Sequence, residues 1–236
     1  MRVAVVTCEH ASAALPAGVD LGVDAAIVCS HVGWDPGALD VARAVSERLG
    51  AVLHAGRHTR LYVDLNRAEE GAGVIPTRSF GSDIPGNRNL PAGERARRLA
   101  VHRAYRTAVD RAVAAAVAEG GCLHLAVHSF AAEVEGMVRR YDGGVLFDPD
   151  RARESALAAQ ILAALAAAGL TVRANEPYLG TDDGLTTWLR GRYGDGGYAG
   201  LEIEVAQALT PARRATLAAA VAAAAAELCR VGIHRP

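Results

Sequence analysis

Short apolar segments alternate along this chain with longer stretches of helical periodicity, and this pattern constrains the fold most strongly. The apolar segments are rich in Val, Leu and Ile, and their length is typical of buried strands. The expected strands are residues 2–7, 51–54, 61–64, 122–127, 144–147, 170–173 and 198–205. Alternation of such strands with helices favours an α/β fold with a mainly parallel, mixed central sheet and helices on both faces.

Capping residues indicate where several helices begin and end. Asp35-Pro36 and Asp148-Pro149 each combine an acidic N-cap with a proline at the first helical position. These two helices should stop before Gly50 and at Gly169, because glycine is common just after a helix. Further helices are expected over residues 91–119, through Trp188, and over residues 210–230.

Composition limits the class of protein. A chain of 236 residues, of which 51% are hydrophobic, can bury one sizeable core, so we expect a single domain over residues 1–236. The formal net charge of −1 gives no electrostatic case for a nucleic acid or an anionic membrane as partner. The first apolar run is too short for a signal peptide, so the expected location is the cytoplasm.

Four polar residues lie where predicted strands end or where a strand turns into a helix: His10, Asp35, His128 and Glu204. Sites in open parallel sheets lie outside the carboxyl ends of the strands. Two imidazoles and one carboxylate can hold Zn²⁺ and leave a position for water, and a separate glutamate can take the proton of that water. The sequence therefore predicts a metal-dependent hydrolase site.

Each of these assignments has an alternative. Glu9 could replace His10 as the ligand, although neighbouring strand residues face opposite ways, and His31 is a second replacement. Asp35 before a proline is also typical of ordinary helix capping. Glu202 shares a strand face with the predicted base, and the solvated face of an edge strand would explain both carboxylates.

Asn66-Arg67, which follows the predicted strand at 61–64, is a candidate carboxylate clamp. Arginine binds carboxylates through a planar fork, often bidentately, and a neighbouring amide can add a hydrogen bond. Asp64 could hold Arg67 or another cation in place. A surface salt bridge is the alternative for this pair.

Several short blocks, in order along residues 8–207, together resemble the N-formylglutamate amidohydrolase family. The blocks are Cys8-Glu9-His10, Trp34-Asp35-Pro36-Gly37, residues 59–67 with Asp-Leu-Asn-Arg, residues 127–130 and residues 201–207. The resemblance implies a zinc-carboxypeptidase-like α/β fold and metal-assisted amide hydrolysis. It also implies site roles, namely ligands His10, Asp35 and His128, base Glu204, and carboxylate-binding residues Asn66 and Arg67.

From this resemblance we expect a hydrolase that uses Zn²⁺, or another divalent transition metal, to convert N-formyl-L-glutamate to formate and L-glutamate, a reaction of histidine degradation. The second acid group of the substrate needs another cation, for which Arg60, Arg78 and Arg139 are candidates. The expected partner is a small N-acyl amino acid, and a homo-oligomer stays open. The alternatives are a related zinc peptidase or cell-wall amidase, and a non-catalytic metal- or ligand-binding module on the same scaffold.

Overall fold

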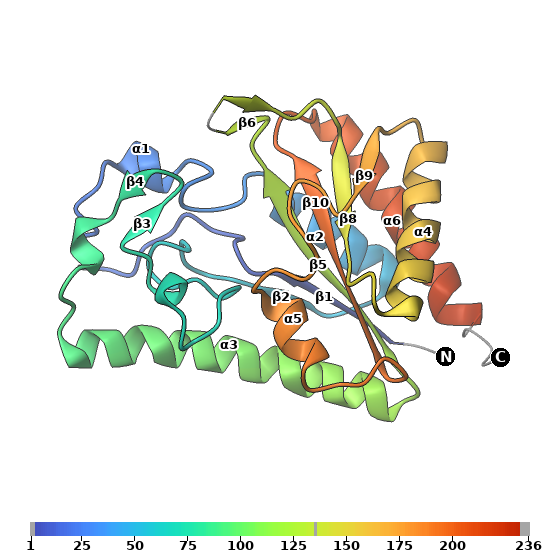
Figure 1. Ribbon diagram of the computed structural model, residues 1–236, viewed down its shortest axis with the longest axis horizontal. Coiled ribbons are helices and arrows are strands. Elements are labelled where there is room, and N and C mark those ends of the chain that lie inside the picture. Colours follow the sequence, from blue (N-terminus) through green and yellow to red (C-terminus); the bar gives the residue numbers. More distant parts are fainter. Residues whose placement is uncertain (1–2, 135, 232–236) are drawn as a thin grey trace.

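A six-stranded mixed sheet lies at the centre of the computed structural model, which describes residues 3–134 and 136–231 (Figure 1). Its strands are β1 (Val3–Cys8), β2 (Leu53–Ala55), β5 (Cys122–Phe130), β8 (Gly143–Leu146), β9 (Val172–Ala174) and β10 (Tyr198–Ala206). They lie side by side in the order β2-β1-β5-β10-β8-β9. The strands β2, β1, β5 and β10 run parallel, whereas β8 is antiparallel to β10 and parallel to β9.

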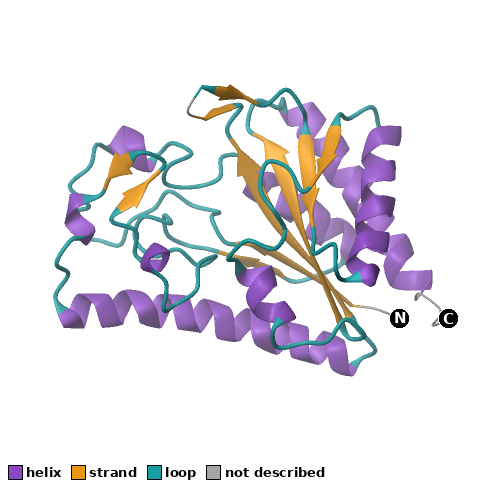
Figure 2. Cartoon of the chain, in the orientation of Figure 1, coloured by secondary structure: helices purple, strands orange, loops and turns teal. Residues whose placement is uncertain are grey.

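Helices cover both faces of this sheet (Figure 2). One face packs against α2 (Ala38–Leu49), α4 (Ala152–Ala167) and α6 (Pro211–Val231). The other face packs against α3 (Ala92–Ala118) and α5 (Leu185–Arg190). Because side chains alternate between the two faces of a strand, each face of the sheet has its own hydrophobic core. Leu125 and Ile203 face the first set of helices, whereas Cys122 and Tyr198 face the second. The predicted α/β fold with a mainly parallel mixed sheet is confirmed.

The predicted strand at residues 61–64 is wrong, because this segment is a loop. Leu61 and Val63 are buried, but each packs into a small cluster away from the main sheet, made of loop side chains together with helix residues such as Val28 and Leu99. The Asp64 amide donates to the Val74 carbonyl at 2.8 Å, a single contact rather than a strand ladder. The apolar pattern of this segment therefore predicts its burial correctly, but it does not predict whether the segment pairs with a strand.

Several predicted boundaries also shift. The helix expected from Asp35-Pro36 begins at Ala38, with Gly37 at its N-cap in the left-handed region at φ 83°. The strand ending at His128 extends to Phe130. The remaining short elements are α1 (Ala25–Val28), η1 (Ala72–Val74), η2 (Pro85–Asn87), the hairpin β3–β4 (Arg78–Ser79 and Ser82–Asp83) and the hairpin β6–β7 (Glu133–Val134 and Met137–Val138). None of the helices among the described residues could span a membrane.

Candidate active site

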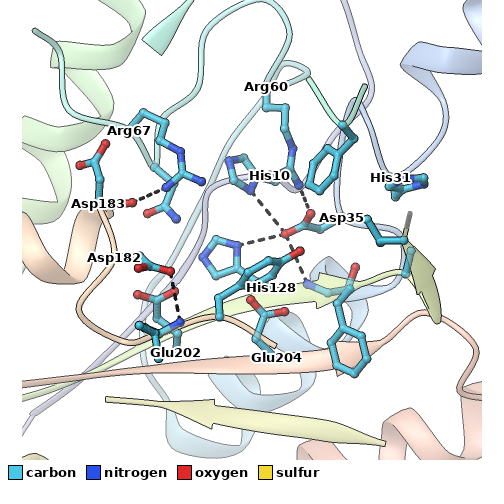
Figure 3. Close-up of a pocket in the computed structure, with 18 residues that line it drawn as sticks. His10, His31, Asp35, Arg60, Arg67, His128, Asp182, Asp183, Glu202 and Glu204 are labelled. Carbon is cyan, nitrogen blue, oxygen red and sulfur yellow. Dashed lines mark hydrogen bonds and ion pairs between the residues drawn. The ribbon is translucent and has the colours of Figure 1, made fainter. Parts of the chain in front are cut away.

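The predicted site residues, except Arg78 and Arg139, line one cavity of about 220 Å³ at the carboxyl ends of the parallel strands (Figure 3). His10 follows β1, and His128 lies near the end of β5. Glu204 on β10 pairs in register with His128, so the two residues are neighbours across the strands. Asp35 comes from the turn before α2, where its backbone amide donates to the His10 carbonyl at 2.9 Å. Strand direction thus explains why residues far apart in sequence converge here.

His10, Asp35 and His128 form a group that could hold a metal ion. One potential ligand atom from each lies within 4.8 Å of the others, and all three residues are buried. Asp35 Oδ2 lies 3.0 Å from His128 Nδ1 and 3.4 Å from His10 Nδ1. The capping alternative for Asp35 is wrong, because its side chain faces these imidazoles and the helix N-cap is Gly37.

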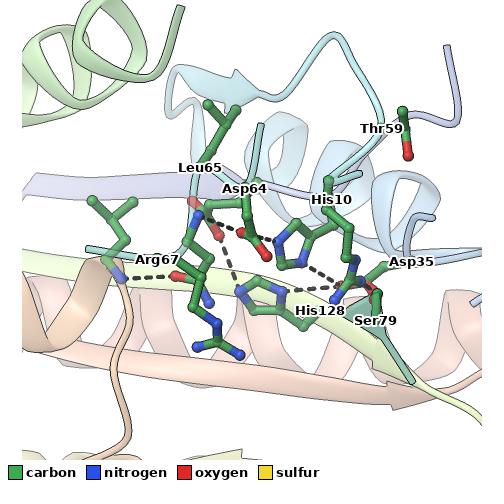
Figure 4. Close-up of polar contacts among 12 residues, drawn as sticks. His10, Asp35, Thr59, Asp64, Leu65, Arg67, Ser79 and His128 are labelled. Carbon is green, nitrogen blue, oxygen red and sulfur yellow. Dashed lines mark hydrogen bonds and ion pairs between the residues drawn. The ribbon is translucent and has the colours of Figure 1, made fainter. Parts of the chain in front are cut away.

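A second layer of carboxylates holds the outer nitrogen of each imidazole. His10 Nε2 lies 2.7 Å from Asp64 Oδ1, and His128 Nε2 lies 3.0 Å from Glu9 Oε2. Tyr105 Oη donates to the other oxygen of Glu9 at 2.9 Å. Figure 4 shows His10 between the carboxylates of Asp64 and Asp35. Metal-binding histidines commonly have such a carboxylate on the outer nitrogen, which fixes the ring and its tautomer.

The charges of this buried group favour a bound cation. Glu9, Asp35, Asp64 and Glu204 bring four carboxylates that are each at most 5% exposed, whereas the positive charges among them are the Arg60 guanidinium, in contact with Asp35, and a protonated His128. An ionised Asp64 only accepts hydrogen bonds, so the proton of neutral His10 lies on Nε2 and a lone pair on Nδ1. That buried Nδ1 has no hydrogen-bond partner among the described residues. Its lone pair therefore faces a carboxylate oxygen, an arrangement that a cation would stabilise.

The two histidines differ in their acid–base behaviour. Burial and the nearby Arg60 guanidinium lower the pKa of His10 to about 4, so this imidazole is neutral at pH 7. Burial also disfavours the charge of His128, but the Glu9 carboxylate outweighs it and raises the pKa of His128 to about 9. The same contact, against burial, lowers the pKa of Glu9 to about 2. Without a metal, His128 therefore carries a proton that a metal would displace.

Glu204 and Glu202 both line the cavity, but they have different surroundings. Glu202 accepts a hydrogen bond from Thr186 Oγ1 at 2.5 Å. The buried Glu204 Oε2 has no hydrogen-bond partner among the described residues, and burial raises the pKa of Glu204 to about 7. Their strand β10 lies between β5 and β8, so the edge-strand alternative is wrong. Glu204 is the carboxylate with an uncommitted oxygen.

Asn66 and Arg67 also line the cavity. Asn66 Oδ1 accepts a hydrogen bond from the Leu185 amide at 2.7 Å, which leaves its NH₂ group to donate. Arg67 donates one N–H to the Asp183 carbonyl and has no ion pair with a carboxylate among the described residues. Asp64, which the sequence suggested as a partner of Arg67 or another cation, contacts His10.

The long helix α3 fixes the loop that carries Asn66 and Arg67. Arg106 donates to the carbonyls of Leu65 at 3.2 Å and Arg67 at 2.9 Å. His102 Nε2 lies 2.9 Å from the same Arg67 carbonyl, and Arg98 donates to the Tyr62 carbonyl at 3.2 Å. Residues 98, 102 and 106 share one helix face because they are four apart. Residues of α3 therefore hold the backbone of the Asn66-Arg67 segment and form none of the side-chain hydrogen bonds given above for these two residues.

The other predicted residues have more varied positions. Arg60 lines the cavity, but its guanidinium contacts Asp35. His31 lines the cavity outside the His10–Asp35–His128 group. Arg139 is not among the cavity-lining residues, and its guanidinium lies over the rings of Phe130 and Tyr178, at 5.8 and 5.2 Å.

Sequence reasoning missed several residues that support the site. Tyr105 on α3 bonds Glu9, Thr186 on α5 bonds Glu202, and Asp183 bonds Arg67 through its carbonyl. Each of these residues lies at least 16 positions in the sequence from the residue that it contacts, and each belongs to a segment with no motif of its own. Nothing in the local sequence pattern marks these residues.

Comparison with known proteins shows a match to one family and similarity to two solved structures. The N-formylglutamate amidohydrolase family model matches residues 3–210. The gene product Atu2144 from Agrobacterium tumefaciens is 33% identical, with 96% of this chain and 92% of that chain covered and a TM-score of 0.80. An N-formylglutamate amidohydrolase from Ralstonia eutropha is 22% identical, with 98% and 95% covered and a TM-score of 0.80, a likeness that shows the fold alone. Comparison with curated proteins gave no match.

Proposed function

The chain belongs to the N-formylglutamate amidohydrolase family, and we propose that it hydrolyses the N-acyl amide bond of an acidic amino acid in a metal-dependent reaction, with N-formyl-L-glutamate as first substrate. The observation that carries this proposal is the uncommitted oxygen of Glu204 in the same cavity as the His10–Asp35–His128 group. A potential base and a potential metal site face one space that a small substrate can enter.

The residues present fit a divalent metal ion. His10 Nδ1, His128 Nδ1 and a carboxylate oxygen of Asp35 would be the donors, and nitrogen and oxygen donors of this kind suit Zn²⁺. Glu9 and Asp64 would hold the two rings so that both Nδ1 atoms face Asp35. When bound, the metal supplies Lewis-acid polarisation of the amide carbonyl and lowers the pKa of a water molecule.

Glu204 is proposed to move the proton during hydrolysis. Its carboxylate would accept a proton from the attacking water and deliver it to the amide nitrogen as the carbon–nitrogen bond breaks. The water oxygen then appears in the released acid, and the amino acid leaves as the amine. Burial raises the pKa of Glu204 to about 7, which is suited to both taking and returning a proton near neutral pH.

Asn66 and Arg67 are proposed to bind a carboxylate of the substrate. Arg67 has no carboxylate partner of its own among the described residues, and the Asn66 NH₂ group is free to donate beside it. Together they would fix the amino acid on one side of the metal group and thereby orient the amide for attack.

Formate release from N-formyl-L-glutamate by the purified, zinc-loaded protein tests the proposed reaction directly. A related zinc peptidase or cell-wall amidase would leave this substrate intact and cleave a peptide or wall fragment. A non-catalytic module would bind the metal and hydrolyse neither. Absence of formate release from protein with stoichiometric zinc would therefore reject the proposed substrate.

Replacement of Arg67 by alanine should raise the KM for N-formyl-L-glutamate. Hydrogen bonds to charged groups contribute roughly 1.5–3 kcal/mol, so we expect kcat/KM to fall about 10- to 150-fold. Arg67→Lys keeps the charge but not the planar fork, and its loss should be smaller. Steady-state kinetics with N-formyl-L-glutamate and with N-formyl-L-leucine, whose side chain is uncharged, check the assignment. An equal loss for both substrates would show that Arg67 does not bind the side-chain carboxylate. Arg57→Ala, at an exposed arginine outside the cavity, is the control.

Replacement of Glu9 by glutamine should weaken metal binding without removing a ligand. Loss of an outer carboxylate typically costs about 10- to 100-fold in metal affinity, because the imidazole is less basic and less well oriented. Competition with a chromogenic chelator measures the affinity for zinc, and Glu69→Gln, at a surface residue paired with Arg103, is the control. Unchanged affinity in the Glu9 variant would show that His128 needs no partner on Nε2.

A further inference from the structure

One wall of the cavity is apolar, and a formyl group does not account for it. Phe80, Phe130, Ala131 and Val134 line the cavity together. Phe130 and Ala131 follow His128 and Ser129 at the end of β5, and Val134 comes from the hairpin β6–β7. Phe80 lies in the turn between β3 and β4, in the other hairpin. A formyl group could contact such a wall only through the one hydrogen atom on its carbonyl carbon.

Phe80 is exposed at this position in spite of its size. Its side chain is 40% exposed, and its backbone is in the left-handed region at φ 43°, followed by Gly81 at φ 78°. Two consecutive residues with positive φ form the tight hairpin turns that usually contain Asn-Gly or Asp-Gly. A bulky residue in this conformation is an outlier, and such outliers concentrate at functional sites.

Phe80, which belongs to this apolar lining, lies on the side of the metal group away from Arg67 (Figure 3). The Phe80 ring packs edge-on against His31, with 5.3 Å between the ring centroids, and lies 5.8 Å from the guanidinium carbon of Arg60. Figure 3 shows His31 and Arg67 on opposite sides of the metal group. If Arg67 holds the amino acid and the amide carbon lies at the metal group, the acyl group points towards His31 and Phe80.

We propose that this wall is an acyl-binding subsite that accepts apolar acyl groups larger than formyl, in contact with Phe80 and Val134. The inference rests on the proposed function and names its substrate class, N-acyl-L-glutamates with a short hydrocarbon acyl chain. The cavity of about 220 Å³ must hold the glutamate as well, which limits the acyl chain to a few carbon atoms. Hydrolysis of such a substrate is balanced as before, since water adds across the amide bond and gives a carboxylic acid and L-glutamate.

The test is a series of N-acetyl-, N-propanoyl- and N-butanoyl-L-glutamate, whose amides have similar intrinsic reactivity. Burial of each added methylene should raise kcat/KM about fourfold along the series in the unaltered protein. Phe80→Ala and Phe80→Asn should flatten the rise, and asparagine suits the left-handed turn if alanine impairs folding. Val52→Ala is the control, since Val52 is 71% exposed and lies outside this cavity.

Measurements of substrate binding distinguish a failure of this inference from a failure of the proposed function. Calorimetry with the zinc-loaded Glu204→Gln protein gives a dissociation constant for each substrate without turnover. Formate release from N-formyl-L-glutamate together with kcat/KM that falls from acetyl to butanoyl would overturn the acyl subsite alone. If no N-acyl-L-glutamate is hydrolysed, the proposed function fails, and the dissociation constants decide the subsite. About fourfold tighter binding per methylene that depends on Phe80 would support it, and affinity independent of acyl length would overturn it.

Discussion

The Glu204→Gln protein should bind zinc stoichiometrically and yet lose about 10²- to 10⁴-fold in kcat for N-formyl-L-glutamate. Glutamine preserves the size of the side chain but cannot accept the proton of the attacking water. The metal group is built from other residues, so its three donors are intact in this variant. Formate release and elemental analysis of the same preparation measure the two properties side by side.

Glu202→Gln is the matched control, because it makes the same chemical change on the same face of β10. Glu202 already accepts a hydrogen bond from Thr186, so its loss should reduce kcat by less than about tenfold, the scale of one hydrogen bond. Full activity in the Glu204 variant would end its role as the base. A larger loss from Glu202→Gln than from Glu204→Gln would transfer that role to Glu202.

The same Glu204→Gln substitution, which should lower activity, should raise the stability of the metal-free protein at high pH. Burial raises the pKa of Glu204 from 4.5 to about 7 in the folded state. Stability from such a group is complete below pH 4.5 and declines as the pH rises through 7, by about 3 kcal/mol at most. Metal-free Glu204→Gln should therefore exceed the unaltered protein in stability at pH 8 but not at pH 4.5. Urea titrations at the two pH values measure the difference, and a uniform loss would indicate a structural role.

Strand direction and side-chain alternation explain how much of the site could be predicted. His128 and Glu204 end two apolar segments, and in parallel strands such ends meet at the same edge of the sheet. Alternation along residues 201–205 placed Glu202 and Glu204 on one face, opposite Leu201 and Ile203. These inferences need only local pattern together with the direction in which the strands run.

Contacts that depend on the course of the loops could not be predicted. Leu61 is apolar and buried in a loop, and periodicity alone does not distinguish that state from a strand. Glu9 and His10 were expected to face opposite ways, but both lie beyond β1 and reach His128 from different sides. The role of Tyr105 depends on how α3 crosses the loops, which no local pattern contains.

Removal of the metal should abolish formate release, and zinc should restore it. Without a cation, His10 Nδ1 keeps no hydrogen-bond partner among the described residues and faces the Asp35 carboxylate at 3.4 Å. Dialysis against a chelator, followed by titration with zinc, should return activity in proportion to bound metal up to one ion per chain. Activity that persists in metal-free protein would reject metal dependence altogether.

The pH dependence of zinc affinity tests the ligand assignment separately from activity. The pKa of His128 is raised to about 9 in the metal-free protein, and a metal binds only the neutral imidazole. Zinc must therefore displace that proton, and its affinity should rise about tenfold per pH unit between pH 7 and 8. His128→Ala should lose stoichiometric zinc, whereas His31→Ala, at a cavity histidine outside the group, should retain it. Retention of zinc by the His128 variant would remove His128 from the ligand set, and loss of zinc from the His31 variant would add His31 to it.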